Sequence, residues 1–298
     1  MRCMERPVVC GVDLWPGSEE VARLAVALAN ELDRPTSVVH VTGGAAPGSP
    51  DPTAGQVREL RRLSTLVEQL GGRGQTATML RGGEPAEQVL GVAREQDAEL
   101  LVVGSRGLRE IGCALLGSVS SELMREAPCP VVVVPPGCAL PVAGIRVLVV
   151  GVDGGERDAP LLRLAADLAR RLEAAVHVVH AFHVTPAAVG MGPTAPPLGS
   201  ELRKAAEERL DRAVDDAGVS ARRSVVELPA AEALERAAEH DGAGLIAVAS
   251  RGHGKLHSIL HGSVTVRLAA EAPVPVLVLP PAAELGAGSG HYELSDAA

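Results

Sequence analysis

Glycines and hydroxyl side chains at a defined spacing are the residues of this chain best placed to do chemistry. Gly104 and Gly107 are separated by two residues, and nine further residues lead to Gly117 and Ser118. Glycine lets backbone N–H groups approach an anion where a Cβ atom would obstruct it. A helix that begins at Ser118 adds the partial positive charge of its N-terminus. The spacing therefore predicts a cradle for an anion.

Other side chains near these glycines suit the same role. Ser118 and Ser120 each supply a hydroxyl group. Arg106 and Arg109 are placed to meet phosphate oxygens at the rim of the cradle. Asp13, which follows the first apolar run, is the best candidate for a carboxylate in the site. The alternative interpretation is that the glycines serve only tight turns and close helix packing.

The pattern differs from common cofactor and catalytic motifs. The chain has no Gly-Lys-Ser/Thr of a Walker A loop, and no Gly-x-Gly-x-x-Gly follows the first apolar run, which argues against NAD and FAD. It also has no Gly-x-Ser-x-Gly elbow and no His-Glu-x-x-His motif. We therefore assign no catalytic residues and expect a binding protein more than an enzyme.

The chain carries these features twice. Gly11-Val12-Asp13 recurs as Gly151-Val152-Asp153, 140 residues later, and the glycine loop recurs 145 residues later. A repeat of about 140 residues predicts two copies of one domain, since solenoid repeats are much shorter. The candidate residues of the second copy are Asp153, Ala249, Arg251, Gly252, Gly262, Ser263 and Val264.

The second copy departs from the first where Ala249 replaces the glycine at 104. The added methyl group is tolerated where φ is negative, and it obstructs where a phosphate lies close. We favour retained binding in both copies; the alternative is a second loop that has lost its ligand and serves for packing. Three histidines of that loop, His253, His257 and His261, are four residues apart, but helical geometry is not assured there, so we predict no metal site.

Short apolar runs alternate with helical periodicity throughout both copies. The segment 18–32 places Val21, Leu24 and Leu28 on one face, as an amphipathic helix does. The apolar runs are continuous, which is typical of strands in a parallel sheet with both faces covered. The alternation predicts an α/β fold of two tandem, doubly wound, Rossmann-like domains with ligand sites at the carboxyl ends of the strands. The expected strands are 7–12, 36–41, 75–80, 99–104, 131–134, 145–151, 175–182, 222–228, 244–249 and 275–279, and the expected helices are 18–32, 56–70, 85–96, 118–126, 157–173, 200–217, 230–240 and 263–271.

Composition divides the chain and excludes several classes of protein. We expect a domain over 1–137, a Pro/Gly-rich linker over 138–144, a second domain over 145–281 and a loose tail over 282–298.

The formal net charge is −9 and aromatic residues make up 1%, which disfavours binding to nucleic acid. No apolar run reaches the roughly 20 residues of a membrane span. Five cysteines without Cys-x-x-Cys spacing, and no apolar leader, predict a cytoplasmic protein.

These motifs make the chain resemble a tandem universal stress protein over nearly all of residues 6–281. The markers are Gly-Val-Asp after the first strand, the spaced glycine loop, and the closing Pro-Val-x-Val-Val run from Pro130. The resemblance implies the fold of the adenine nucleotide alpha hydrolase-like proteins and binding of ATP, with Mg²⁺ carried on the phosphates. It places Asp13 near the ribose or adenine and Val41 beside the adenine ring. It assigns the ribose and phosphates to Gly104, Gly107, Gly117, Ser118 and Val119.

The resemblance also implies a role in the stress response. ATP occupancy would change the surface of the protein and recruit a protein partner that the sequence does not identify. The alternatives are a slow ATPase or a phosphotransferase that phosphorylates its own Ser118 or Ser120, and a scaffold that needs no ligand. By the same resemblance, strands 131–134 and 276–279 pair across the two copies as an internal pseudo-dimer, and two chains can associate further as a homodimer.

Overall fold

The structure, a computed structural model, describes residues 6–14, 17–42, 54–71, 76–105, 116–141, 144–183, 198–250 and 263–283. The described chain is an α/β protein in which strands and helices alternate, as the sequence predicts. The first half comprises β1 (Val8–Val12), α1 (Ser18–Leu32), β2 (Thr36–Thr42), α2 (Ala54–Leu70), β3 (Thr76–Gly82), α3 (Pro85–Glu95), β4 (Leu100–Gly104), α4 (Ser118–Glu126) and β5 (Val131–Val134). The second half comprises β6 (Val147–Val152), α5 (Asp158–Leu172), β7 (Ala175–Phe182), α6 (Leu198–Ala217), β8 (Arg222–Glu227), α7 (Ala230–Asp241), β9 (Leu245–Ala249), α8 (Ser263–Glu271) and β10 (Val276–Leu279).

Corresponding helices of the two halves end in the same way. Asp33 after α1 has φ 54° and Glu173 after α5 has φ 52°, both in the left-handed region. The next N–H groups, of Arg34 and Ala174, then donate to carbonyl oxygens in the last turns of α1 and α5, each at 2.8 Å. The sequence repeat therefore extends to the details of local structure.

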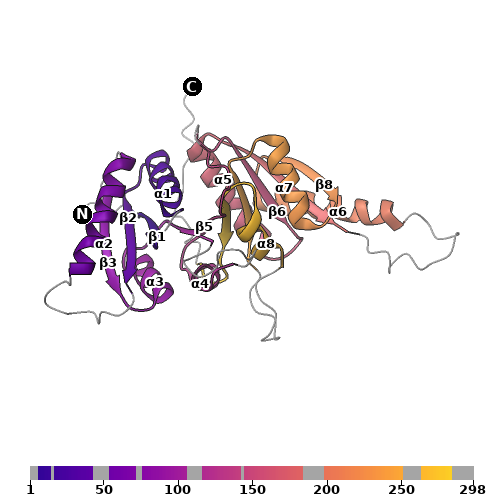
Figure 1. The fold of residues 1–298 in the computed structure, drawn as a ribbon. Helices are drawn as coiled ribbons and strands as arrows, with labels where there is room; N and C mark the ends of the chain where they lie inside the picture. The colour runs from indigo at the N-terminus through magenta and orange to yellow at the C-terminus, as the bar shows by residue number, and fades with distance from the viewer. Residues whose placement is uncertain are drawn as a thin grey trace, which may run out of the picture.

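In the described part of the chain, all ten strands belong to one sheet in the order β3-β2-β1-β4-β5-β10-β9-β6-β7-β8. Every neighbouring pair is parallel except β5 and β10, which are antiparallel and pair Val132 with Leu277. The two halves thus join edge to edge, with β3 and β8 at opposite ends of the molecule (Figure 1). The expected pairing of 131–134 with 276–279 is confirmed.

Apolar side chains are buried on both faces of the sheet. One face packs against α1, α2, α5 and α6, and the other against α3, α4, α7 and α8. In β5, Val132 and Val134 belong to the first core and Val131 and Val133 to the second. Because both faces are covered, the strands read as continuous apolar runs, as expected.

The segment between the halves packs against the rest of the protein. Cys138 and Leu140 lie against the apolar core, and the N–H of Ala139 donates to the carbonyl of Pro273 at 2.8 Å. Residues that we expect to form a linker therefore contribute to the junction of the two halves. Within the described ranges, no helix has the length and apolar character that crossing a membrane requires.

Candidate functional site

In the first half, parallel pairing brings Asp13 and Gly104 to one edge of the sheet. β1 and β4 are neighbours, with Gly11 opposite Val103, so their carboxyl ends lie side by side. The hydroxyl of Ser18, in the first turn of α1, donates to Asp13 Oδ1 at 2.5 Å. This bond holds the Asp13 carboxylate against the start of α1.

The start of α4 adjoins the same edge, but several of its polar groups are used within the protein. The N–H of Gly117 donates to the carbonyl of Ser105 at 2.8 Å. Ser120, which we expect to offer its hydroxyl to an anion, instead donates to the carbonyl of Gly104 at 2.6 Å. These two bonds hold α4 against the end of β4. Ser118 at the start of the helix is exposed, and Val119 is half-buried.

Several predicted site residues lie outside the described residues. They are Arg106, Gly107, Arg109, Arg251, Gly252 and Gly262. The histidines at 253, 257 and 261, for which we predict no metal site, also lie outside the described residues. Val41, near the end of β2, is half-buried and packs against the core on the α3 side of the sheet.

The second half contains a cavity of about 840 Å³ at the carboxyl ends of its strands. Its walls come from the end of β6 and the following turn, residues 151–158, and from the end of β9, residues 248–250. β7 and α7 also contribute, as does the start of α8. The cavity therefore lies where doubly wound sheets bind their ligands.

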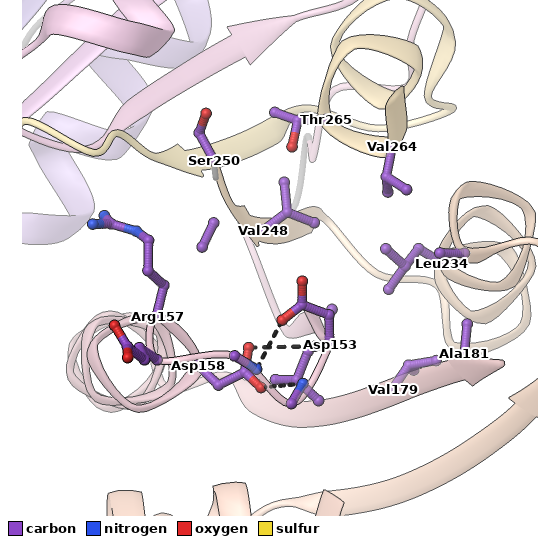
Figure 2. A pocket seen from close by; sticks show the side chains of 17 residues that line it. Asp153, Arg157, Asp158, Val179, Ala181, Leu234, Val248, Ser250, Val264 and Thr265 are labelled. Atoms are coloured by element: carbon purple, nitrogen blue, oxygen red, sulfur yellow. Dashed lines mark hydrogen bonds between the residues drawn. The ribbon is translucent and has the colours of Figure 1, made fainter. Parts of the chain in front are cut away.

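The lining of this cavity changes character from one side to the other. Val179, Ala181 and Leu234 form an apolar wall on one side (Figure 2). Arg157 rises from the start of α5 on the opposite side of the view, and Ser250 lies above it (Figure 2). One end of the cavity thus suits an apolar group and the other a polar or charged group.

Two carboxylates hold the turn after β6. Asp158 is 5% exposed and accepts hydrogen bonds from the N–H of Gly154 at 2.7 Å and of Asp153 at 3.3 Å. Asp153 in turn accepts from the N–H of Gly155 at 2.9 Å. Burial raises the pKa of the Asp158 carboxyl, although these backbone bonds favour its ionised form. The N–H groups of Asp153, Gly154 and Gly155 are thus directed to carboxylates of the protein itself.

A sequence model of the universal stress protein family matches the chain twice, over residues 4–135 and 144–280. The chain belongs to this family. The universal stress protein Rv2623 of Mycobacterium tuberculosis is 30% identical over 285 residues, which is 91% of this chain and 95% of that protein. The match therefore spans both halves of this chain.

Solved structures of universal stress proteins share the fold. One from Archaeoglobus fulgidus is 18% identical and covers 92% of this chain and 98% of its own, with a TM-score of 0.65. Another from the same organism, in complex with dAMP, is 26% identical and covers 44% of this chain and 98% of its own, with a TM-score of 0.35.

In this universal stress protein, the cavity contains some of the residues predicted for the second half. Asp153, Ala249 and Val264 line it, and Ser263 begins α8 beside them. Sequence reasoning missed Ala181, although it lies 140 residues after Val41 and the repeat offset would have found it. It also missed Arg157, Asp158, Val179, Leu234, Ser250 and Thr265. Ser250 and Thr265 follow Ser105 and Ser120 by 145 residues, whereas Arg157 has only Gly17 as its counterpart.

Proposed function

We propose that this universal stress protein is a nucleotide-responsive binding protein that takes ATP in the cavity of its second half. The cavity of about 840 Å³ at the carboxyl ends of β6 and β9 is the observation that supports the proposal. Its volume lies within the range of roughly 300–1,000 Å³ that small-molecule sites occupy. Its position is that of ligand sites in doubly wound sheets.

The two sides of the cavity match the two ends of a nucleotide. The apolar wall of Val179, Ala181 and Leu234 suits the flat, uncharged adenine ring. The carboxylate of Asp153, which lines the cavity between the two ends, is an acceptor for ribose hydroxyls. The phosphates would lie toward the start of α8, where the helix N-terminus attracts negative charge.

The first half is proposed to bind in the same way, through the corresponding residues. Asp13 and Val41 would take the nucleoside, and the start of α4 would take the phosphates. Mg²⁺ would be held chiefly by phosphate oxygens. Among the described residues, no three or more His, Cys, Asp or Glu side chains gather as a metal site of their own.

Matched substitutions at the starts of α4 and α8 test this proposal. Ser118→Asp and Ser263→Asp each place a carboxylate where phosphate would lie, while an acidic residue in a first helical turn favours the helix itself. We expect calorimetric titration with ATP to show two sites in the wild type, one in each single variant and none in the double variant. Ser220→Asp, at an exposed turn before β8, is the control and should bind as the wild type does.

Thermal unfolding gives a second readout of the same proteins. ATP at 100 times the Kd of a site should add about 2.7 kcal/mol of stability for each occupied site, so the wild type should gain about twice this amount, each single variant about 2.7 kcal/mol and the double variant nothing. Undiminished ATP binding by the double variant would refute the assignment to these helix starts. A wild type that binds neither ATP nor ADP would refute the function and favour the ligand-free scaffold. Chromatography of the bound nucleotide after incubation reports whether ADP forms, which the proposal does not require.

A further inference from the structure

Arg157 places a cation at a position where the first half has a glycine. It lines the cavity immediately before α5, and it is the only basic residue among the described residues that do so. Its counterpart in the first half, 140 residues earlier, is Gly17. The second half has thus lost a glycine at Ala249 and gained an arginine at the same cavity.

Local structure gives no reason for an arginine at this position. Residue 157 is the N-cap of α5, where Ser, Thr, Asp and Asn are preferred, and its side chain makes no capping bond. A positive charge there opposes the helix dipole. Burial also lowers the pKa of the guanidinium, so the position disfavours its charged form. At the start of α5, the positive charge of Arg157 is therefore unfavourable.

One hydrogen bond holds the Arg157 guanidinium in place, and one of its buried N–H groups has no partner among the described residues. Its Nη2 donates to the carbonyl of Pro280, just after β10, at 2.6 Å. Its Nε is buried and has no hydrogen-bond partner in the described part of the chain. A guanidinium offers five N–H donors and no acceptor, so an anion is the ligand that satisfies it best. The neighbouring carboxylate of Asp158 is already taken up by backbone N–H groups.

We infer that Arg157 binds the phosphate groups of the nucleotide in the second half, so that this half distinguishes phosphorylated from unphosphorylated adenine ligands by a contact at the position where the first half has Gly17. This inference rests on the proposed function. Arg157 lies across the cavity from the apolar wall that would hold adenine, so a nucleotide extends from one to the other (Figure 2). The methyl group of Ala249 would hinder the close approach of a phosphate, and the positive charge of Arg157 would compensate by attracting the phosphate.

Substitutions of Arg157 in the Ser118→Asp protein test the inference, because only the second half then binds. Arg157→Gln keeps polarity without charge, and Arg157→Lys keeps charge without the planar fork of donors. Arg163→Gln, on the exposed face of the same helix, is the matched control for loss of one charge. Calorimetric titration measures the Kd of ATP, ADP and adenosine for each protein.

We expect Arg157→Gln to weaken ATP and ADP about 10- to 100-fold, as loss of a charged hydrogen bond does, and adenosine less than about twofold. Arg157→Lys should fall between, and Arg163→Gln should match the parent. Unchanged ATP affinity in Arg157→Gln, or equal weakening of ATP and adenosine, would overturn the inference. Failure of the proposed function is seen separately, because the Ser118→Asp parent would then bind no ATP.

Discussion

At the scale of single residues, a cluster of hydrogen-bonded polar side chains lies away from the cavity. The ring of His177, on β7, has Nδ1 2.5 Å from Asp241 Oδ2 and Nε2 2.8 Å from Ser224 Oγ. Arg222 and His240 both reach Asp241 Oδ1 at 2.9 Å. Serine, histidine and aspartate in this order resemble a hydrolase triad. Because His177 is only 4% exposed, we interpret the cluster as a structural link between β7, β8 and the end of α7.

This cluster makes the protein sensitive to acid. Burial lowers the pKa of His177 below 6.5, against the hydrogen bond to Asp241. For Asp241, burial opposes ionisation, but hydrogen bonds from His240, His177 and Arg222 lower its pKa from 3.8 to about 2. Both groups have a lower pKa in the folded protein than in the unfolded chain, so the unfolded chain takes up protons at a higher pH. Their contribution to the free energy of unfolding is therefore fully present above pH 6.5 and is lost on acidification.

We expect urea unfolding to show two losses of stability as the pH falls. The first begins below 6.5 and belongs to His177, and the second, about 2 kcal/mol, lies between pH 3.8 and 2 and belongs to Asp241. Asp241→Asn should be less stable than the wild type at pH 7 and should lack the second loss. Asp211→Asn, at an exposed ion pair with Arg223, is the control. An unchanged acid profile in Asp241→Asn would contradict the interpretation.

At the scale of elements, the strand pair β5 and β10 joins the halves. β5 is fully buried between parallel β4 and antiparallel β10, so each of its residues contributes both to the ladder and to a core. It consists of four valines, whose β-branched side chains suit a pleated, buried surface. The sheet is thereby continuous from one half to the other.

Proline in this strand should cost more than the loss of packing alone. Val133→Ala removes buried methyl groups and should lower the free energy of unfolding by about 2 kcal/mol. Val133→Pro also removes a backbone donor from the centre of the sheet and leaves a buried acceptor unsatisfied, which adds about 1–3 kcal/mol. Chemical denaturation of both variants measures the difference. Equal stability of the two variants would show that the N–H of residue 133 has no part in the ladder.

At the scale of the whole molecule, one carboxylate connects the two halves outside the sheet. Glu99, just before β4, pairs with Arg34 of its own half and with Arg171 from the end of α5. Arg171 also donates to the carbonyl of Leu32 in α1 at 3.1 Å. The Glu99 side chain is only 14% exposed, so the pairs are less screened than ion pairs at the surface. They hold α1 and α5 in one relative position.

Neutralising this carboxylate should loosen the junction. We expect Glu99→Gln to lower the free energy of unfolding by about 1–3 kcal/mol, because two partly buried guanidinium groups lose their charged partner. Glu95→Gln, which breaks an exposed pair with Arg81, should cost less than about 1 kcal/mol. Denaturant titration compares the two variants. A loss in Glu99→Gln no larger than in Glu95→Gln would contradict a structural role for the junction.

Much of the fold follows from patterns that are local in the chain. The helix over 18–32 and the strand over 131–134 have the predicted bounds, because periodicity and turn residues determine such elements within a few residues. The strand expected at 145–151 spans Val147–Val152 instead. Its ladder with β7 begins at Val147, although the carbonyl of Arg146 still accepts a hydrogen bond from the N–H of Ala175 at 2.8 Å. Strand ends depend on the partner strand, which local patterns do not specify.

The sequence by itself determined the two copies, the order of their elements and the edge of the sheet where Asp13 and Asp153 lie. Only the tertiary structure decided which side chains meet there. Gly151 shows why: a Cβ atom at this position would lie 2.7 Å from Leu234 Cδ1, so the glycine allows α7 to pack close enough for Leu234 to line the cavity. Arg157 likewise acquires its hydrogen-bond partner from Pro280, just after β10, which is distant in the chain. The spacing of motifs along the chain reveals that the domain is repeated. The side-chain contacts around the cavity depend instead on how helices and strands that are distant in the chain pack together.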